Sequence, residues 1–217
     1  MKNSIKLFSL VLSFAFSSCT AKEKPIVREE FKEPIKIKTQ EGMEIATFAG
    51  GCFWCTEALF LEVKGVEKVV SGYIGGTVKN PSYREISTGT TGHAEAIQIT
   101  FNPKEVAFED LLEMFFGTHD PTTLNRQGAD VGTQYRSEVF YHSQEQKDKV
   151  EKYIELLEKE KLYSNPIVTK VSSATIFYPA EDYHQNYYNQ NSGQGYCQMV
   201  IAPKLEKLRK FYKSKLK

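Results

Sequence analysis

The chain has 217 residues, of which 28 are basic and 27 are acidic, and 41% are hydrophobic. This length and composition fit one globular domain of ordinary size with an additional tail. The near-neutral charge gives no reason to expect a nucleic acid as a partner, because domains that bind nucleic acids are usually basic. The lysines and arginine near the C-terminus are interpreted as the solvated face of a helix.

The first residues, 1–18, predict a secretory signal peptide of the lipoprotein type. Lys2 and Lys6 precede an apolar run over 7–16, and two serines lead directly into Cys19. A positive start, a short apolar core and small residues before a cleavage site are typical of export, and the run is short for a membrane span. Cys19 would become the lipidated N-terminus and anchor the protein in a bacterial cell envelope. The alternative is an ordinary signal peptide with an incidental Cys19.

Residues 19–41 are rich in Lys and Glu and predict a flexible tether, so the folded domain is expected over 42–217. Three cysteines remain in this domain: Cys52, Cys55 and Cys197. An odd number of cysteines in an exported domain cannot form a closed set of structural disulfides. At least one thiol must therefore be free or cycling, which indicates redox chemistry.

The folded part alternates between apolar patterns of strand and helix period. In chain order we expect a strand ending near Phe48, a helix after Cys52, a strand over 65–74, a short helix over 83–87, a strand over 94–101, a helix over 108–116, a long polar loop over 117–134, a strand over 135–142, a helix over 143–162, a strand over 168–177, a short helix over 181–188, a loop over 189–201 and a helix after Pro203. We expect an α+β fold, a two-layer α/β sandwich with a mixed sheet, a ferredoxin-like core and an irregular C-terminal tail.

The segment Gly50-Gly51-Cys52 places a cysteine between the end of the first predicted strand and the start of the following helix. Unpaired backbone N–H groups and the helix dipole favour a thiolate at such a position, and a lowered thiol pKa makes cysteine reactive. The alternative is a small buried core residue, which is the usual fate of a free cysteine.

Cys55 follows Cys52 by three residues, so the two thiols lie on one face of the helix. The pair fits a thioredoxin-like redox motif, half of a zinc site, or a nucleophile with a helper thiol. The sequence has no second pair of Cys or His residues at metal-binding spacing, so we expect no metal. Phe53 and Trp54 between the thiols suit an apolar substrate group.

Four polar side chains elsewhere are candidates for catalysis. Glu95 begins an otherwise apolar strand and could donate a proton if an apolar pocket raised its pKa; a surface glutamate is the alternative. Tyr83 and Tyr135 lie in or beside long loops and could donate hydroxyl hydrogen bonds, although most tyrosines are packing residues. Asp130 lies in a turn, which it could shape, or it could orient a neighbour.

Several short motifs follow one another in a fixed order over roughly residues 43–212. They are Gly51-Cys52-Phe53-Trp54, Tyr83-Arg84-Glu85, Thr91-Gly92-His93-Ala94-Glu95, Asp120-Pro121-Thr122, Asp130-Val131-Gly132-Thr133-Gln134-Tyr135-Arg136-Ser137 and Ala180-Glu181-Asp182-Tyr183-His184-Gln185. Together they resemble the peptide-methionine (S)-S-oxide reductase family, MsrA, whose members repair oxidised methionine.

The resemblance implies that Cys52 attacks the sulfur of a methionine-S-sulfoxide, free or in a protein, and that Glu95 protonates the sulfoxide oxygen. Phe53 and Trp54 would hold the methyl group of the substrate. The products would be methionine and a sulfenic acid on Cys52.

The resemblance also implies that Tyr83 and Tyr135 hydrogen-bond the sulfoxide oxygen and that Asp130 orders polar groups at the site. The electrons pass through thiols, so no cofactor is needed, and a thioredoxin-like dithiol would recycle the enzyme. We expect a monomer.

A second thiol must convert the sulfenic acid to a disulfide. The commonest family pattern has glycine where this chain has Cys55, so two resolving cysteines are available. We favour Cys197, because a mobile Gly-rich loop around it could meet disulfide geometry without distorting the helix. Cys55 would then pass the disulfide on or be structural.

Three other functions stay open at this point. The Cys52–Cys55 pair would also suit a disulfide oxidoreductase, and a lipoprotein could bind oxidised methionine without catalysis. His184 and Cys197 are close in sequence and could form a protease pair, although no Asn or Asp partner is evident.

Overall fold

The structure, a computed structural model, describes residues 41–217. The predicted signal peptide (1–18), Cys19 and nearly all of the predicted tether (19–41) lie outside the described residues. Within 41–217, no helix has the length and apolar character needed to cross a membrane.

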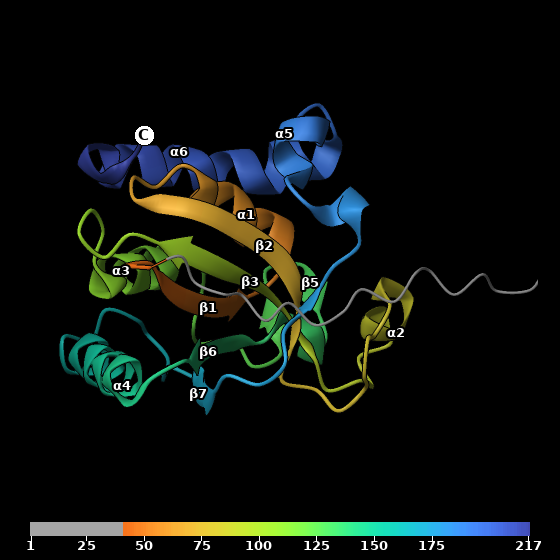
Figure 1. Cartoon of the computed structure of the whole chain (residues 1–217), viewed down its shortest axis with the longest axis horizontal. Coiled ribbons are helices and arrows are strands. Elements are labelled where there is room, and N and C mark those ends of the chain that lie inside the picture. The colour runs from red at the N-terminus through yellow and green to blue at the C-terminus, as the bar shows by residue number, and fades with distance from the viewer. Residues whose placement is uncertain (1–40) are drawn as a thin grey trace, which may run out of the picture.

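A six-stranded sheet forms the centre of the domain, with strand order β7-β6-β1-β3-β2-β8 (Figure 1). The strands are β1 (Glu44–Gly50), β2 (Val66–Ile74), β3 (Ala94–Phe101), β6 (Ser137–Tyr141), β7 (Lys170–Ser173) and β8 (Tyr178–Pro179). The four inner strands pair antiparallel, in the order of a ferredoxin-like core, and β7 adds to β6 in parallel. The expected α+β fold with a mixed sheet is confirmed.

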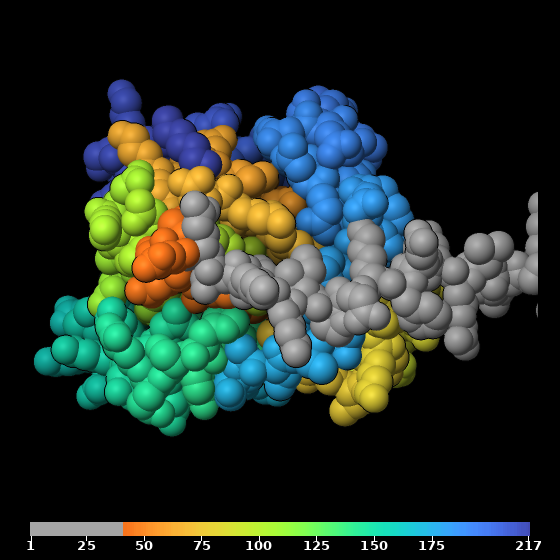
Figure 2. All heavy atoms as spheres, viewed as in Figure 1, coloured from red at the N-terminus to blue at the C-terminus, as the bar shows by residue number. Residues whose placement is uncertain are grey.

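Helices cover the sheet and each other: α1 (Phe53–Leu61), α2 (Tyr83–Ser87), α3 (Phe108–Thr118), α4 (Gln144–Lys159), α5 (Tyr187–Asn191) and α6 (Ala202–Phe211). Helix α1 is buried along most of its length, because β2 and β3 lie on one side and α5 and α6 on the other. Figure 2 shows the C-terminal elements in blue, packed beside the golden-orange atoms of the region that contains β2. The start of α1 is therefore enclosed by segments from both ends of the domain.

The region after α3 contains more structure than predicted. A short hairpin of β4 (Arg126–Gln127) and β5 (Asp130–Val131) lies inside the expected loop, and Tyr135 ends a 3-10 turn (η1, Thr133–Tyr135) instead of starting a strand. The expected strand over 168–177 is also shorter, because only β7 pairs with β6 before the chain crosses to β8. These pairings depend on distant partners, so a local pattern does not reveal them.

The prediction of a loop over 189–201 is wrong. Helix α5 ends at Asn191, only 192–194 lack helical structure, and a π-helical turn (η3, Cys197–Ile201) runs directly into α6. The cause is a buried apolar stripe: Cys197, Ile201, Leu205 and Leu208 are each at most 1% exposed. Their packing against the core outweighs the glycines that suggested a loop.

Candidate active site

Cys52 lies at the junction of β1 and α1, as predicted, and caps the start of the helix with only 9% of its surface exposed. Gly51 before it has φ +95°, a conformation that favours glycine. A Cβ atom on Gly51 would lie 2.6 Å from Cβ of Gln127. The glycine therefore lets the β4–β5 hairpin approach the backbone beside Cys52.

Glu95 is buried on β3, with 2% of its surface exposed, and faces the first turn of α1. Its Oε2 atom accepts the backbone N–H of Phe53 at 3.1 Å. Burial raises the pKa of the carboxyl group from 4.5 to about 8, because the charged form loses its hydration. Glu95 is therefore neutral at pH 7, and the oxygen that does not accept the Phe53 N–H can carry the proton.

Cys55 is also buried and shares a hydrogen bond with Cys52, so the two thiols titrate as a pair. This bond lowers the pKa of Cys55 to about 7, and the positive charge of Lys204 acts in the same direction. The same bond and burial hold the pKa of Cys52 well above its ordinary value. Within this pair the pKa of Cys52 is raised and that of Cys55 is lowered, a direction opposite to the thiolate expected at Cys52, so Cys52 can pass its proton to Cys55 when it attacks.

Tyr196 links this thiol pair to the hairpin. Its hydroxyl oxygen lies 3.7 Å from Sγ of Cys55 and donates a hydrogen bond to Oδ2 of Asp130 at 2.8 Å. Asp130, at the start of β5, is thus placed beside the thiols by a residue for which the sequence analysis proposed no role.

The aromatic residues Phe53 and Trp54 belong to one cluster at the start of α1. The indole of Trp54 stacks on the ring of Tyr187, with centroids 3.7 Å apart and planes 6° apart. Its Nε1–H donates to Nδ1 of His184 at 3.1 Å, and the His184 ring also packs on Phe53 with centroids 5.1 Å apart. Tyr196 meets Trp54 edge-on at 6.1 Å. The cluster forms an apolar wall next to Cys52.

Tyr83 and Tyr135 are half-buried residues that pack on the main core. Tyr83 starts α2, where its N–H donates to Oε1 of Glu181 at 2.8 Å, and its ring lies 4.4 Å from that of His184. Burial raises the pKa of both hydroxyls, and Glu95 and Cys52 raise it further at the high pH at which they are ionised. Both tyrosines therefore keep their protons at neutral pH and can act as donors.

The third thiol, Cys197, is not in a mobile loop. It is fully buried in η3, and burial raises its pKa. His184 bonds to Trp54 instead of Cys197, so the geometry gives no support to a protease pair.

The sequence analysis assigned no role to His184 in the site that formed, and none to Tyr187 or Tyr196. The signal that could have found them is the high density of tyrosines over 183–196, directly before a cysteine. Among residues 41–217, no group of three or more His, Cys, Asp or Glu side chains is arranged to hold a metal ion.

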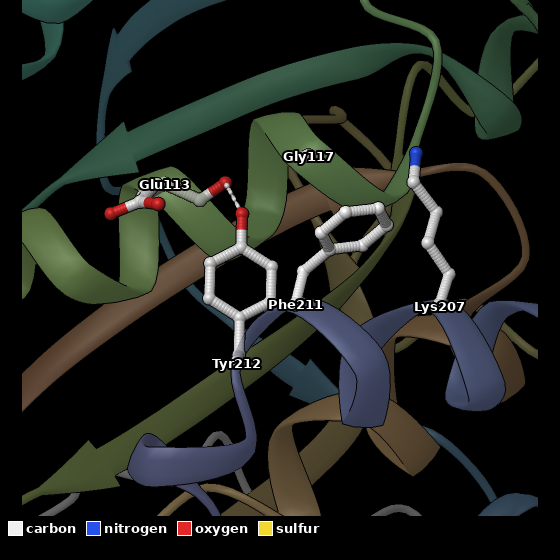
Figure 3. Close-up of a pocket in the computed structure, with 5 residues that line it drawn as sticks. All are labelled: Glu113, Gly117, Lys207, Phe211 and Tyr212. Atoms are coloured by element: carbon white, nitrogen blue, oxygen red, sulfur yellow. Dashed lines mark hydrogen bonds between the residues drawn. The ribbon is translucent and has the colours of Figure 1, made fainter.

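A surface pocket of about 370 Å³ lies away from this chemistry, between α3 and α6 (Figure 3). Its lining includes the exposed ring of Phe211 and the hydroxyl of Tyr212, which donates to the backbone oxygen of Glu113 at 3.4 Å. None of the predicted site residues lines it, so we place the active site at the start of α1.

Paired thiols beside a neutral carboxylic acid are the site of a cysteine-dependent oxidoreductase. Comparison with known proteins identifies the family of oxidoreductases to which the chain belongs. The profile of the family described as "Peptide methionine sulfoxide reductase" matches residues 44–216. The chain therefore belongs to the peptide methionine sulfoxide reductase family, as its motifs indicated, and it is a methionine sulfoxide reductase.

Individual relatives of the chain belong to the same family. The chain is 59% identical over 181 residues to "Peptide methionine sulfoxide reductase MsrA" of Deinococcus radiodurans, covering 82% of this chain and 88% of the relative. It is 54% identical over 185 residues to "Peptide methionine sulfoxide reductase MsrA 1" of Rhodopirellula baltica, and the match covers 85% of this chain and 95% of that relative. Among solved structures, reduced Mxr1 of Saccharomyces cerevisiae superposes with a TM-score of 0.68 at 34% identity, covering 76% of this chain and 96% of Mxr1. Methionine sulfoxide reductase A of Corynebacterium diphtheriae superposes with a TM-score of 0.64 at 37% sequence identity, and the match covers 74% of this chain and 80% of that structure.

The pKa values predict a bell-shaped pH profile for the single-turnover reduction of methionine sulfoxide. The rate should rise with pH through about 7, as the thiol pair loses a proton, and fall above about 8, as Glu95 loses the proton it must donate. Glu95→Gln should lower the rate by about 100-fold or more and remove the falling limb. Stopped-flow measurements at a series of pH values test this, and a falling limb with the same midpoint in the variant would contradict it.

Proposed function

We propose that this protein reduces the S epimer of methionine sulfoxide, in proteins and as the free amino acid, with Cys52 as its nucleophile. The observation that carries the proposal is the buried, neutral Glu95 held on the N–H of Phe53, the residue after Cys52. A sulfoxide oxygen is a poor leaving group until it is protonated, so a reductase of this kind needs a neutral acid beside its thiol.

In the first step, Cys52 Sγ attacks the sulfoxide sulfur while its proton moves to Cys55 and Glu95 protonates the sulfoxide oxygen. The sulfur–oxygen bond of the substrate and the new bond between Cys52 and the substrate sulfur both break as the protonated oxygen is transferred to Cys52. Methionine leaves as the two-electron-reduced product, and Cys52 becomes a sulfenic acid. Protonation of the oxygen by Glu95 offsets the charge that would otherwise develop on it.

The surrounding side chains would orient the sulfoxide. Tyr83 and Tyr135 keep their hydroxyl protons and would donate to the sulfoxide oxygen beside Glu95. The apolar wall of Phe53 and Trp54 would receive the methyl group, which distinguishes the methyl from the oxygen at the chiral sulfur. Asp130 would order this region through Tyr196.

We propose that Cys55, rather than Cys197, attacks the sulfenic acid first. Cys55 shares a hydrogen bond with Cys52 in the resting site, and after the first step it holds the proton that Cys52 gave up, which the sulfenic oxygen needs in order to leave as water. Cys197 is fully buried in a helical turn, so it would have to leave its packing to reach Cys52. Attack by Cys55 forms the Cys52–Cys55 disulfide and releases the sulfenic oxygen as water, and a thioredoxin-like dithiol then reduces that disulfide.

The site of action is proposed from the N-terminal sequence. A signal peptide over 1–18 followed by a lipidated Cys19 would place the enzyme in the bacterial cell envelope, where it would repair exported proteins.

Cys52→Ser tests the reaction itself. With dithiothreitol as reductant, the wild type should reduce methionine-S-sulfoxide and leave the R epimer, and the variant should be inactive because serine cannot form a sulfenic acid. Chiral chromatography of the separated epimers measures both. Equal activity of the two proteins, or reduction of insulin disulfides without reduction of either epimer, would contradict the proposal.

Two single substitutions test the order of the thiols. After one turnover without reductant, Cys197→Ser should contain a Cys52–Cys55 disulfide, and Cys55→Ser should retain the sulfenic acid much longer than the wild type. Peptide mapping by mass spectrometry, with a dimedone trap for the sulfenic acid, measures both. If the Cys55→Ser variant formed a Cys52–Cys197 disulfide as fast as the wild type forms its disulfide, the proposal would be contradicted and Cys197 would be the first resolving cysteine.

Cys19→Ala tests the membrane anchor. In cells grown with labelled palmitate, the full-length protein should carry the label and fractionate with membranes, whereas the variant should do neither. A soluble, unlabelled wild-type protein would show that the signal peptide is of the ordinary kind.

A further inference from the structure

Glu57 is a buried carboxyl group that takes no part in the chemistry described above. It lies on α1 with 2% of its surface exposed. Trp54 precedes it by three residues, so both side chains project from the same side of the helix. A buried carboxyl group needs hydrogen-bond donors, because burial without partners is costly. The partners of Glu57 therefore indicate what it holds.

Those partners are the first backbone groups of α5. Glu57 Oε1 accepts the N–H of Asn186 at 2.8 Å, and Oε2 accepts the N–H of Tyr187 at 3.3 Å. The first N–H groups of a helix have no partner within the helix. Asn186 has φ +50°, so the chain turns sharply at the point where the carboxyl group caps it. Glu57 thus fixes the start of α5 onto α1.

The residue that this cap fixes directly is Tyr187, whose ring is stacked on Trp54 with centroids 3.7 Å apart. Two neighbouring residues are tied down separately: His184 accepts the indole N–H of Trp54, and Gln185 bonds in both directions with the backbone of Ser71 on β2. Neither of those bonds sets the position of the Tyr187 ring. The two bonds to Glu57 hold the Tyr187 backbone at its own nitrogen and at the preceding one, and the far end of the ring is held by its hydroxyl, which donates to Oε1 of Gln194 at 3.0 Å.

We propose that Glu57 is a positioning residue that holds Tyr187 over Trp54 and thereby fixes the wall of the pocket that receives the methyl group of the substrate. The inference rests on the proposed function of that wall. Glu57 itself touches neither the substrate nor the thiols; it acts through Tyr187.

Glu57→Gln is the direct test, because glutamine has nearly the same size but offers one acceptor oxygen and turns an NH₂ group toward an N–H. KM for methionine-S-sulfoxide should rise about tenfold, and kcat should change less than about twofold, since the substitution weakens the hydrogen bonds that hold the binding wall and leaves Cys52 and Glu95 unchanged. Trp54 is the only tryptophan of the chain, so its fluorescence reports the stack with Tyr187. The emission should brighten or shift in the variant.

Glu62→Gln is the matched control, because Glu62 directly follows α1 and pairs with Arg209 on the surface. It should leave KM and the Trp54 emission unchanged. In a Tyr187→Leu background, Glu57→Gln should have little further effect on KM, because the residue through which it acts is gone. Unchanged KM and emission in Glu57→Gln, or a full additive effect in the double variant, would overturn the proposal.

A measurement on the wild type covers the case in which Glu57→Gln does not fold. The amides of Asn186 and Tyr187 should exchange with deuterium more slowly than those of 192–194, because they are bonded to a buried carboxyl group. Equally fast exchange would overturn the proposal. The fluorescence and exchange measurements need no turnover, so their failure is distinct from a failure of the enzyme to reduce methionine sulfoxide.

Discussion

The hydrogen bond from the Phe53 backbone to Glu95 joins the start of α1 to the middle of the sheet at 3.1 Å. Strand β3 pairs with β1 from Ile97 onward and with β2 along its whole length, where Glu95 lies opposite Tyr73, so the sheet fixes the position of Glu95. Cys52 is separated from the end of β1 only by Gly51, and its place is fixed by the same sheet. The acid and the nucleophile therefore lie together because of the antiparallel pairing, and burial by the surrounding core keeps the acid protonated.

The rest of the site is added from the C-terminal third of the chain. After β8 the chain passes over α1, where His184 and Tyr187 pack on Trp54 and Tyr196 approaches Cys55. This segment gives α1 a second buried side and closes the apolar wall. Two buried polar side chains of α1, those of Cys55 and Glu57, each have a hydrogen-bond partner in this added segment, so their burial is not left unsatisfied. The catalytic groups come from the sheet, and the substrate wall depends on the outer layer.

The sequence predicted those elements whose cause is local. The strand, glycine turn and helix around Cys52 follow from alternation and turn chemistry, and β2, β3 and α3 appear within a few residues of their expected bounds. The C-terminal helical turn was missed because the glycines near Cys197 favour a loop, while the burial that overrides them is tertiary. The motif resemblance identified Cys52 and Glu95, but local pattern alone could not show that Glu95 is buried or that the pKa of Cys55 is lowered while that of Cys52 is raised. Both depend on residues distant in sequence.

The proposed reduction of methionine sulfoxide depends most on the protonation state of Glu95. This state can be observed directly by ¹³C NMR of the protein labelled at glutamate carboxyl carbons, with Glu95→Gln used to assign the signal. The Glu95 signal should be that of a protonated carboxyl group at pH 7 and should titrate near pH 8. A signal that is already ionised at pH 7, with an ordinary midpoint near 4.5, would contradict the proposed mechanism.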